Sequence, residues 1–140
     1  MKRTETREQA FKLIYSIEIQ KNMDEEQVEL FMQEHGIDEQ QEVDYVKEIF
    51  NGIKQNKEEI VNLIQNNLKE KWSVDRISKI DFAILELAIF ELVFSKLPYK
   101  VVINEAVELA KKYGEDNSKS FVNGILASIV KEKKLAEEEE

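Results

Sequence analysis

The sequence has 140 residues, of which 42 % are hydrophobic and 35 % charged, so it is the size of one ordinary domain and apolar enough to fold as one. It contains no cysteine, which excludes disulfides, thiolate zinc sites and thiol catalysis and agrees with a reducing, cytoplasmic location. The net charge of -9, taken as a whole, argues against a general nucleic-acid binder.

Apolar residues recur at spacings of three and four along nearly the whole chain, which predicts helices and no strands. The first helix is expected over residues 4–20 and the second over residues 24–35, begun by Asp24 and closed by Gly36. A third over residues 38–55 and a fourth from Asn56 are separated by a short connection, so we expect an antiparallel pair.

A short helical turn is expected over residues 72–78, followed by an apolar helix from Ile80 to Phe94. Its acidic residues are five positions apart and share no face, which is typical of a central helix surrounded by others, and it is too short to span a membrane. Pro98 then precedes a helix over residues 99–113, which Gly114 ends, and the last helix should run from Asn117 or Ser118 to about Lys133.

These elements predict an all-α fold, a compact bundle of seven or eight helices. We expect a single helical domain over residues 1–134 and an acidic, flexible tail over residues 135–140. The amino terminus is charged where a secretory signal would be apolar, so no export signal is expected.

The residues needed for catalysis are scarce. The only histidine, His35, stands beside Gly36 at an expected helix end, where a capping or solvated role is typical. One histidine without cysteine cannot form an ordinary zinc site, and no phosphate-binding loop or dinucleotide fingerprint is present. We therefore expect a protein that binds partners, with no enzymatic activity, no metal and no cofactor.

Positive charge is concentrated at the two ends of the chain. Residues 1–21 hold five Lys or Arg against three acids, and residues 95–134 hold eight against five, whereas residues 22–94 hold seven against seventeen. If the fold brings the two ends together, they form a locally positive face on an acidic protein.

Two features near the carboxyl end stand out. Gly124 lies inside an otherwise good helix, and we expect a close helix crossing that leaves no room for a Cβ atom. The segment from Asn117 to Phe121 combines small polar and basic residues with an aromatic ring at a helix start. Such a start suits phosphate and the ring can stack on a base, although periodicity alone favours a helix cap and a core Phe.

Several motifs together resemble the NusB family of transcription antitermination factors. They are PYKVVINEAVELAKKYG at Pro98–Gly114, FVNGIL at Phe121–Leu126, AILELAIFEL at Ala83–Leu92, Trp72 with Arg76, and Arg3, Arg7, Ala10 and Leu13 ahead of Tyr15. The resemblance covers essentially the whole chain.

The resemblance implies two packed helical subdomains that pair with NusE, a small-subunit ribosomal protein. The pair would hold boxA, a single-stranded element of nascent RNA, in a complex that lets RNA polymerase read through terminators in ribosomal RNA operons. It also leaves a homodimer open, since some relatives self-associate. The implied partner contacts are Tyr15 and Asp81, and the implied RNA contacts are Lys2, Arg3, Arg7, Asn117, Ser118, Lys119, Ser120 and Phe121.

This sequence departs from the family pattern where RNA would bind. Thr4, Glu5 and Thr6 stand where relatives often have further arginine, and Glu86 stands where many have arginine. We therefore expect weak RNA binding by the chain alone. The alternative is a protein-binding helical module that makes no direct RNA contact.

Overall fold

The computed structural model describes residues 1–22 and 24–138, and every regular element in this part of the chain is helical. Six α-helices have ten residues or more; α7 is a single turn, η1 is a 3-10 turn and η2 is a π-helix. In chain order the elements are α1 (Arg3–Gln20), α2 (Glu25–Glu34), α3 (Gln40–Asn66), η1 (Val74–Arg76), α4 (Lys79–Ile89), η2 (Phe90–Phe94), α5 (Tyr99–Tyr113), α6 (Ser118–Glu132) and α7 (Leu135–Glu138).

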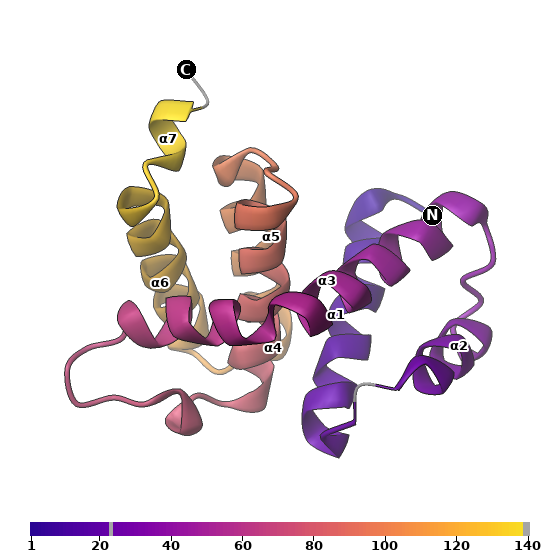
Figure 1. Ribbon diagram of the computed structural model, residues 1–140. Coiled ribbons are helices and arrows are strands. Elements are labelled where there is room, and N and C mark those ends of the chain that lie inside the picture. Colours follow the sequence, from indigo (N-terminus) through magenta and orange to yellow (C-terminus); the bar gives the residue numbers. More distant parts are fainter. Residues whose placement is uncertain (23, 139–140) are drawn as a thin grey trace.

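The helices form two groups that share a central helix. Figure 1 shows α1 and α2 on one side, α5 and α6 side by side on the other, and α3 extending across both. Helix α4 contacts α1, α3, α5 and α6, so the most apolar segment of the sequence is enclosed as its pattern predicts. The all-α prediction is confirmed.

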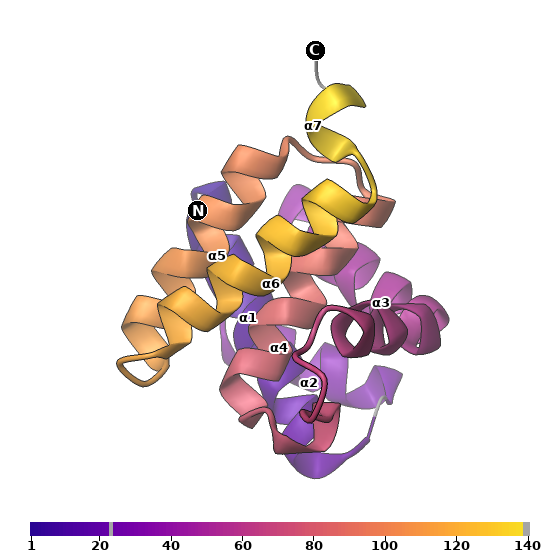
Figure 2. The same ribbon diagram turned by 90° about the vertical axis from the view of Figure 1, so that its left-hand side faces the viewer.

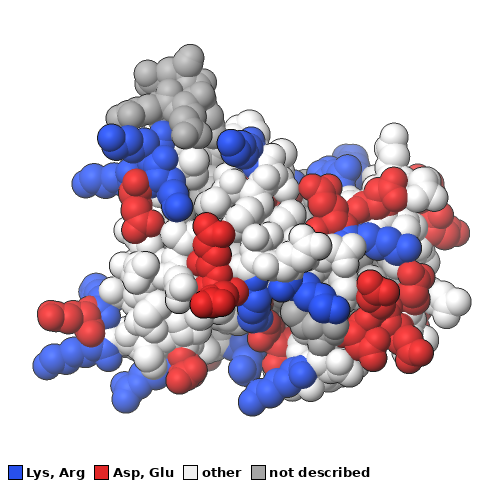
Figure 3. Space-filling model, viewed as in Figure 1, with Lys and Arg blue, Asp and Glu red and all other residues white. Residues whose placement is uncertain are grey.

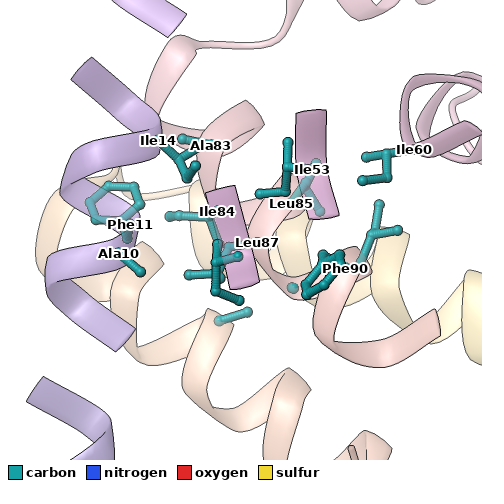
Figure 4. Close-up of a cluster of buried hydrophobic side chains, with 14 of the residues drawn as sticks. Ala10, Phe11, Ile14, Ile53, Ile60, Ala83, Ile84, Leu85, Leu87 and Phe90 are labelled. Carbon is teal, nitrogen blue, oxygen red and sulfur yellow. The ribbon is translucent and has the colours of Figure 1, made fainter. Parts of the chain in front are cut away.

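One hydrophobic core runs through both groups (Figure 4). Phe11 and Ile14 of α1 and Ile53 and Ile60 of α3 are at most 2 % exposed and pack with residues of α4. The stripe predicted for the first helix is therefore confirmed, because Ala10, Leu13 and Ile17 are buried as well.

The predicted antiparallel pair around Asn56 is wrong, because the two segments form one long helix, α3, with a kink. Asn56 alone leaves the helical region (φ -114°, ψ 18°), and its side-chain Nδ2 donates a hydrogen bond to the Gly52 carbonyl at 2.8 Å. Ile53 and Ile60, on either side of the kink, both remain fully buried. The chain therefore bends around α4 without turning back, and the bundle has fewer helices than expected.

The end of the central helix widens into the π-helix η2, where the Ser95 amide donates a hydrogen bond to the Phe90 carbonyl. Gly52 of α3 makes room for this turn, since a Cβ atom there would lie 1.9 Å from Cε1 of Phe90. The close approach explains why a glycine occupies the middle of α3.

Several smaller predictions can be placed in this fold. Asp24 accepts a hydrogen bond from the Glu26 amide at the start of α2, and Gly36 is left-handed (φ 65°), as expected. The predicted tail begins as α7, and residues 139–140 lie outside the described residues. Within the described ranges no helix has both the length and the apolar character to cross a membrane.

Candidate nucleic-acid interface

The first basic region lies at the start of α1. Lys2 and Arg3 are exposed, and the Arg3 guanidinium carbon lies 4.1 Å from the ring centroid of Tyr45 in α3. This cation–π contact holds Arg3 against the surface while leaving it accessible. Both residues can reach a phosphate from this position.

Arg7 is placed differently, in a buried network between α1, α3 and η2. It is 6 % exposed, and its Nε and Nη2 donate to the two carboxylate oxygens of Glu91 at 2.8 and 3.1 Å. The Tyr45 hydroxyl donates to Glu91 Oε2 at 3.0 Å, and Glu105 Oε1 lies 3.4 Å from Nη1 of Arg7. Burial acts to lower the pKa of Arg7, but these partners raise it overall. As placed, Arg7 fastens α1 to the core and leaves only a small part of its side chain open to the groove between α1 and α5.

The second basic region is the turn between α5 and α6. Asn117, Lys119 and Ser120 are exposed and Phe121 is half-buried. Ser118 is only 2 % exposed, and its Oγ accepts a hydrogen bond from the Glu115 amide at 3.0 Å. This bond closes the turn, so Ser118 shapes the segment from the inside. The neighbouring Asn117, Lys119 and Ser120 are the residues that face solvent.

A cleft of about 780 Å³, here called the α6 cleft, opens beside this helix start. One wall is α6 itself, and the other is the segment that joins α3 to α4 and carries η1. Its lining residues are Asn67, Leu68, Lys69, Trp72, Arg76, Ile77, Ser78, Asp81, Glu115, Asn117, Ser118, Ser120, Phe121, Gly124 and Ile125. Four of the five residues predicted from Asn117 to Phe121 are therefore brought together on one hollow surface.

Hydrogen bonds fix the two walls of the α6 cleft. The Gln65 side chain donates to the Trp72 carbonyl at 3.0 Å and accepts from the Val74 amide at 3.1 Å. The Ser128 hydroxyl of α6 donates to Oδ1 of Asn67, at the end of α3. Trp72 is 51 % exposed on this frame.

The two residues predicted to contact a protein partner lie in different settings. Asp81 lines the α6 cleft and is 9 % exposed, and its Oδ1 is buried without a hydrogen-bond partner among the described residues. Burial raises the pKa of Asp81, and hydrogen bonds from Ser118 and Ser78 oppose this rise. Tyr15 is half-buried in α1, its ring 6.3 Å from that of Phe11.

Helix α5 lies between the two predicted RNA-binding regions (Figure 2). Thr4 donates to Glu105 at 2.9 Å and Lys112 to Glu8 at 2.7 Å, so α1 does pack against the basic carboxyl half of the chain. A shallow groove between α1 and α5 is lined by Glu105 and Glu108 as well as by lysines. The two regions are on neighbouring surfaces and do not merge into one basic patch.

Charge on the visible face is separated along the molecule. Figure 3 shows Asp and Glu gathered over α2 and the start of α3, and Lys and Arg gathered where α6 ends. The gathered carboxylates on the α2 side repel RNA phosphates, which disfavours RNA there.

Glu86, which the family resemblance singled out as a departure from the expected pattern, does not lie on the surface. It is fully buried at the joint of α1, α3 and α4, where Lys57 Nζ lies 2.6 Å from its Oε2 and also pairs with Glu18. Burial raises the pKa of Glu86 well above its ordinary value of 4.5. This departure from the pattern therefore lies in the core and not on the surface.

The comparisons with known proteins agree with this geometry. The model of the NusB family matches residues 4–131. The chain belongs to the NusB family. A transcription antitermination protein NusB from Acetivibrio thermocellus is 43 % identical over 137 residues, which are 97 % of this chain and 93 % of that protein.

Solved structures of NusB proteins match over nearly the whole chain. The T. maritima NusB structure has a TM-score of 0.87 and 37 % identity, covering 98 % of both chains. A chain in the crystal structure of antitermination factors NusB and NusE in complex with dsRNA has a TM-score of 0.83 and 28 % identity, covering 94 % of this chain and 98 % of that one. NusB proteins are transcription antitermination factors and not enzymes, which confirms the expectation that this chain has no enzymatic activity.

The sequence pattern did not predict that Gly124 and Trp72 line a cleft. Gly124 was expected at a close helix crossing, which is wrong, because a Cβ atom there would meet nothing within 4 Å. Trp72 was singled out only by the family resemblance, and no role was predicted for it. Its wall is formed by the irregular segment after α3, whose path no periodicity predicts, although a lone exposed tryptophan in a polar stretch is a usable signal.

Proposed function

We propose that this chain is a transcription antitermination factor that pairs with NusE and binds boxA RNA, helping RNA polymerase to read through terminators in ribosomal RNA operons. The observation that carries the proposal is the match over nearly the whole chain to NusB proteins, among them one crystallised with NusE and dsRNA. The exposed helix start beside the α6 cleft supports it from the geometry.

Within this proposal, RNA phosphates meet Lys2, Arg3 and Lys119, and the bases meet the surface around Asn117, Ser120 and Phe121. Ser118 shapes that surface from beneath, and Arg7 acts by holding α1 in place. Three phosphate contacts correspond to a salt slope of about 2 for a single strand, so electrostatics alone bind weakly. We therefore propose that NusE supplies the remaining affinity, through a surface that includes Tyr15 and the neighbourhood of Asp81.

The test is equilibrium binding of a boxA-like single strand and of a scrambled strand, at one stated salt concentration, with and without NusE. We expect a preference for boxA that is strongest with NusE. Equal affinity for the two strands in the presence of NusE would contradict the proposal and favour the alternative of a protein-binding module.

A matched pair of charge reversals locates the contact. Lys119→Glu at the α6 start should weaken RNA binding and reduce the salt slope by about 1. Lys47→Glu is the control, because Lys47 is also exposed and pairs with Glu29 of α2, 3.2 Å away, on the acidic side. It should leave RNA affinity unchanged.

A further inference from the structure

We propose that the α6 cleft binds one unpaired base of the RNA, and that position 124 is a glycine because a side chain there would occupy the space of that base. This inference rests on the proposed function and deepens it, by assigning a base-binding site to Trp72, Phe121 and Gly124.

The argument begins with the four glycines of the chain. Gly36 is left-handed, a Cβ atom at Gly52 would strike Phe90, and one at Gly114 would lie 2.4 Å from Oγ of Ser118. Each of these three has a structural reason within the fold itself. Gly124 is different, because it lies inside α6 without a positive φ and has open space where its Cβ would be.

A glycine at such a position weakens the fold without compensation from packing. In an exposed helix interior it lowers the folding equilibrium constant about fivefold relative to alanine. Local rules are broken in this way mainly at functional sites. Since Gly124 lines the α6 cleft one helical turn from Phe121, the open space is part of the cleft.

The walls of the cleft suit a base better than a phosphate or an acidic peptide. Half-exposed Trp72 and half-buried Phe121 offer aromatic faces, on which bases of any sequence stack. The lining contains two basic residues, Lys69 and Arg76, and two acidic residues, Asp81 and Glu115. It therefore has no excess of positive charge to attract a phosphate or an acidic peptide. A volume of about 780 Å³ is within the usual range for pockets that hold small molecules.

The cleft is also fixed before any ligand arrives. Gln65 holds the Trp72 segment through two hydrogen bonds, and Ser128 joins α6 to Asn67. A preformed site loses little conformational entropy on binding. Among the described residues, Oδ1 of Asp81 has no hydrogen-bond donor, so the site holds an acceptor that a ligand could use.

The experiment uses Gly124→Ala and Gly124→Leu, with Ala127→Leu as the control. Ala127 is exposed on α6 and lies outside the lining of the α6 cleft, so it adds the same bulk to the same helix elsewhere. Stability is measured by urea unfolding and RNA affinity by titration with boxA-like RNA in the presence of NusE. The emission of Trp72, the only tryptophan of the chain, is followed in titrations with RNA alone.

We expect Gly124→Ala to fold more stably than the wild type and yet to bind RNA more weakly. Gly124→Leu should lower RNA affinity by about 5- to 150-fold, the loss of one stacked base, and abolish quenching of Trp72 emission by RNA. Ala127→Leu should keep wild-type RNA affinity and quenching. A purely structural glycine would instead lose stability on substitution.

The outcomes separate this inference from the proposed function. If the wild type prefers boxA and Gly124→Leu binds and quenches equally well, the base-binding cleft is refuted and the proposed function stands. If Gly124→Leu weakens NusE binding in the absence of RNA, the cleft is part of the NusE surface around Asp81 and the inference is likewise overturned. If the wild type shows no preference for boxA with NusE, the proposed function fails first.

Discussion

Replacement of Arg7 by methionine tests whether this arginine belongs to the core or to the RNA surface. The Arg7 and Glu91 side chains are 7 % and 2 % exposed and are joined by two hydrogen bonds. Methionine preserves much of the side-chain bulk but leaves the Glu91 carboxylate buried without its cation. Breaking a buried ion pair by removing one partner costs about 3–5 kcal/mol.

That loss is a large part of the stability of an ordinary domain, which is about 5–15 kcal/mol. Urea unfolding followed by circular dichroism at pH 7 measures it directly. The double variant Arg7→Met with Glu91→Leu removes both charges, and it should be more stable than the sum of the two single losses predicts.

RNA binding by the same variants, measured where they are folded, completes the test. If Arg7→Met unfolds within about 0.5 kcal/mol of the wild type and yet reduces the salt slope of RNA binding, Arg7 contacts phosphate and the reasoning from burial is refuted.

Three further substitutions test the packing of the core and of the candidate site. Gly52→Ala should destabilise the fold by about 1–3 kcal/mol in urea unfolding, because its Cβ would displace the Phe90 ring; an unchanged midpoint would show that η2 yields easily. Ser118→Ala should cost about 1 kcal/mol, since the Glu115 amide loses its acceptor; loss of RNA affinity at full stability would instead make Ser118 a direct contact. The pKa of Glu86 is raised by folding, so its contribution to stability is fully present below about pH 4.5 and is lost as the pH rises through the folded-state pKa. Glu86→Gln should therefore lose less stability than the wild type as the pH is raised from 5 to 8. If the free energies of unfolding of the two proteins changed in parallel with pH, the raised pKa of Glu86 would be contradicted.

Periodicity predicted most of the helices because burial on one face is a local property of the sequence. Helix α4 shows this well, since acids five residues apart correctly indicated a helix enclosed on all sides. The kink at Asn56 was not predictable in the same way. Asn56, followed three residues later by Glu59, is typical of a helix start, but the burial of Ile53 and Ile60 on either side of it keeps the helix running forward.

The site was predictable in composition but not in geometry. The charge pattern identified both basic regions, yet it could not show that Arg7 is neutralised by Glu91, eighty-four residues away. Nor could it show that Ser118 is buried beneath exposed neighbours. Pairing across such sequence distances depends on tertiary packing, which local patterns do not encode.

Amide chemical shifts of the labelled protein, recorded as boxA RNA is added in the presence of NusE, test the central claim most directly. RNA-dependent changes should appear at the α1 start around Lys2 and Arg3, at residues 117–121 and 124 of the α6 cleft, and at Trp72. The acidic surface of α2 should show none. Changes concentrated on α2, or none at all on addition of RNA, would contradict the account.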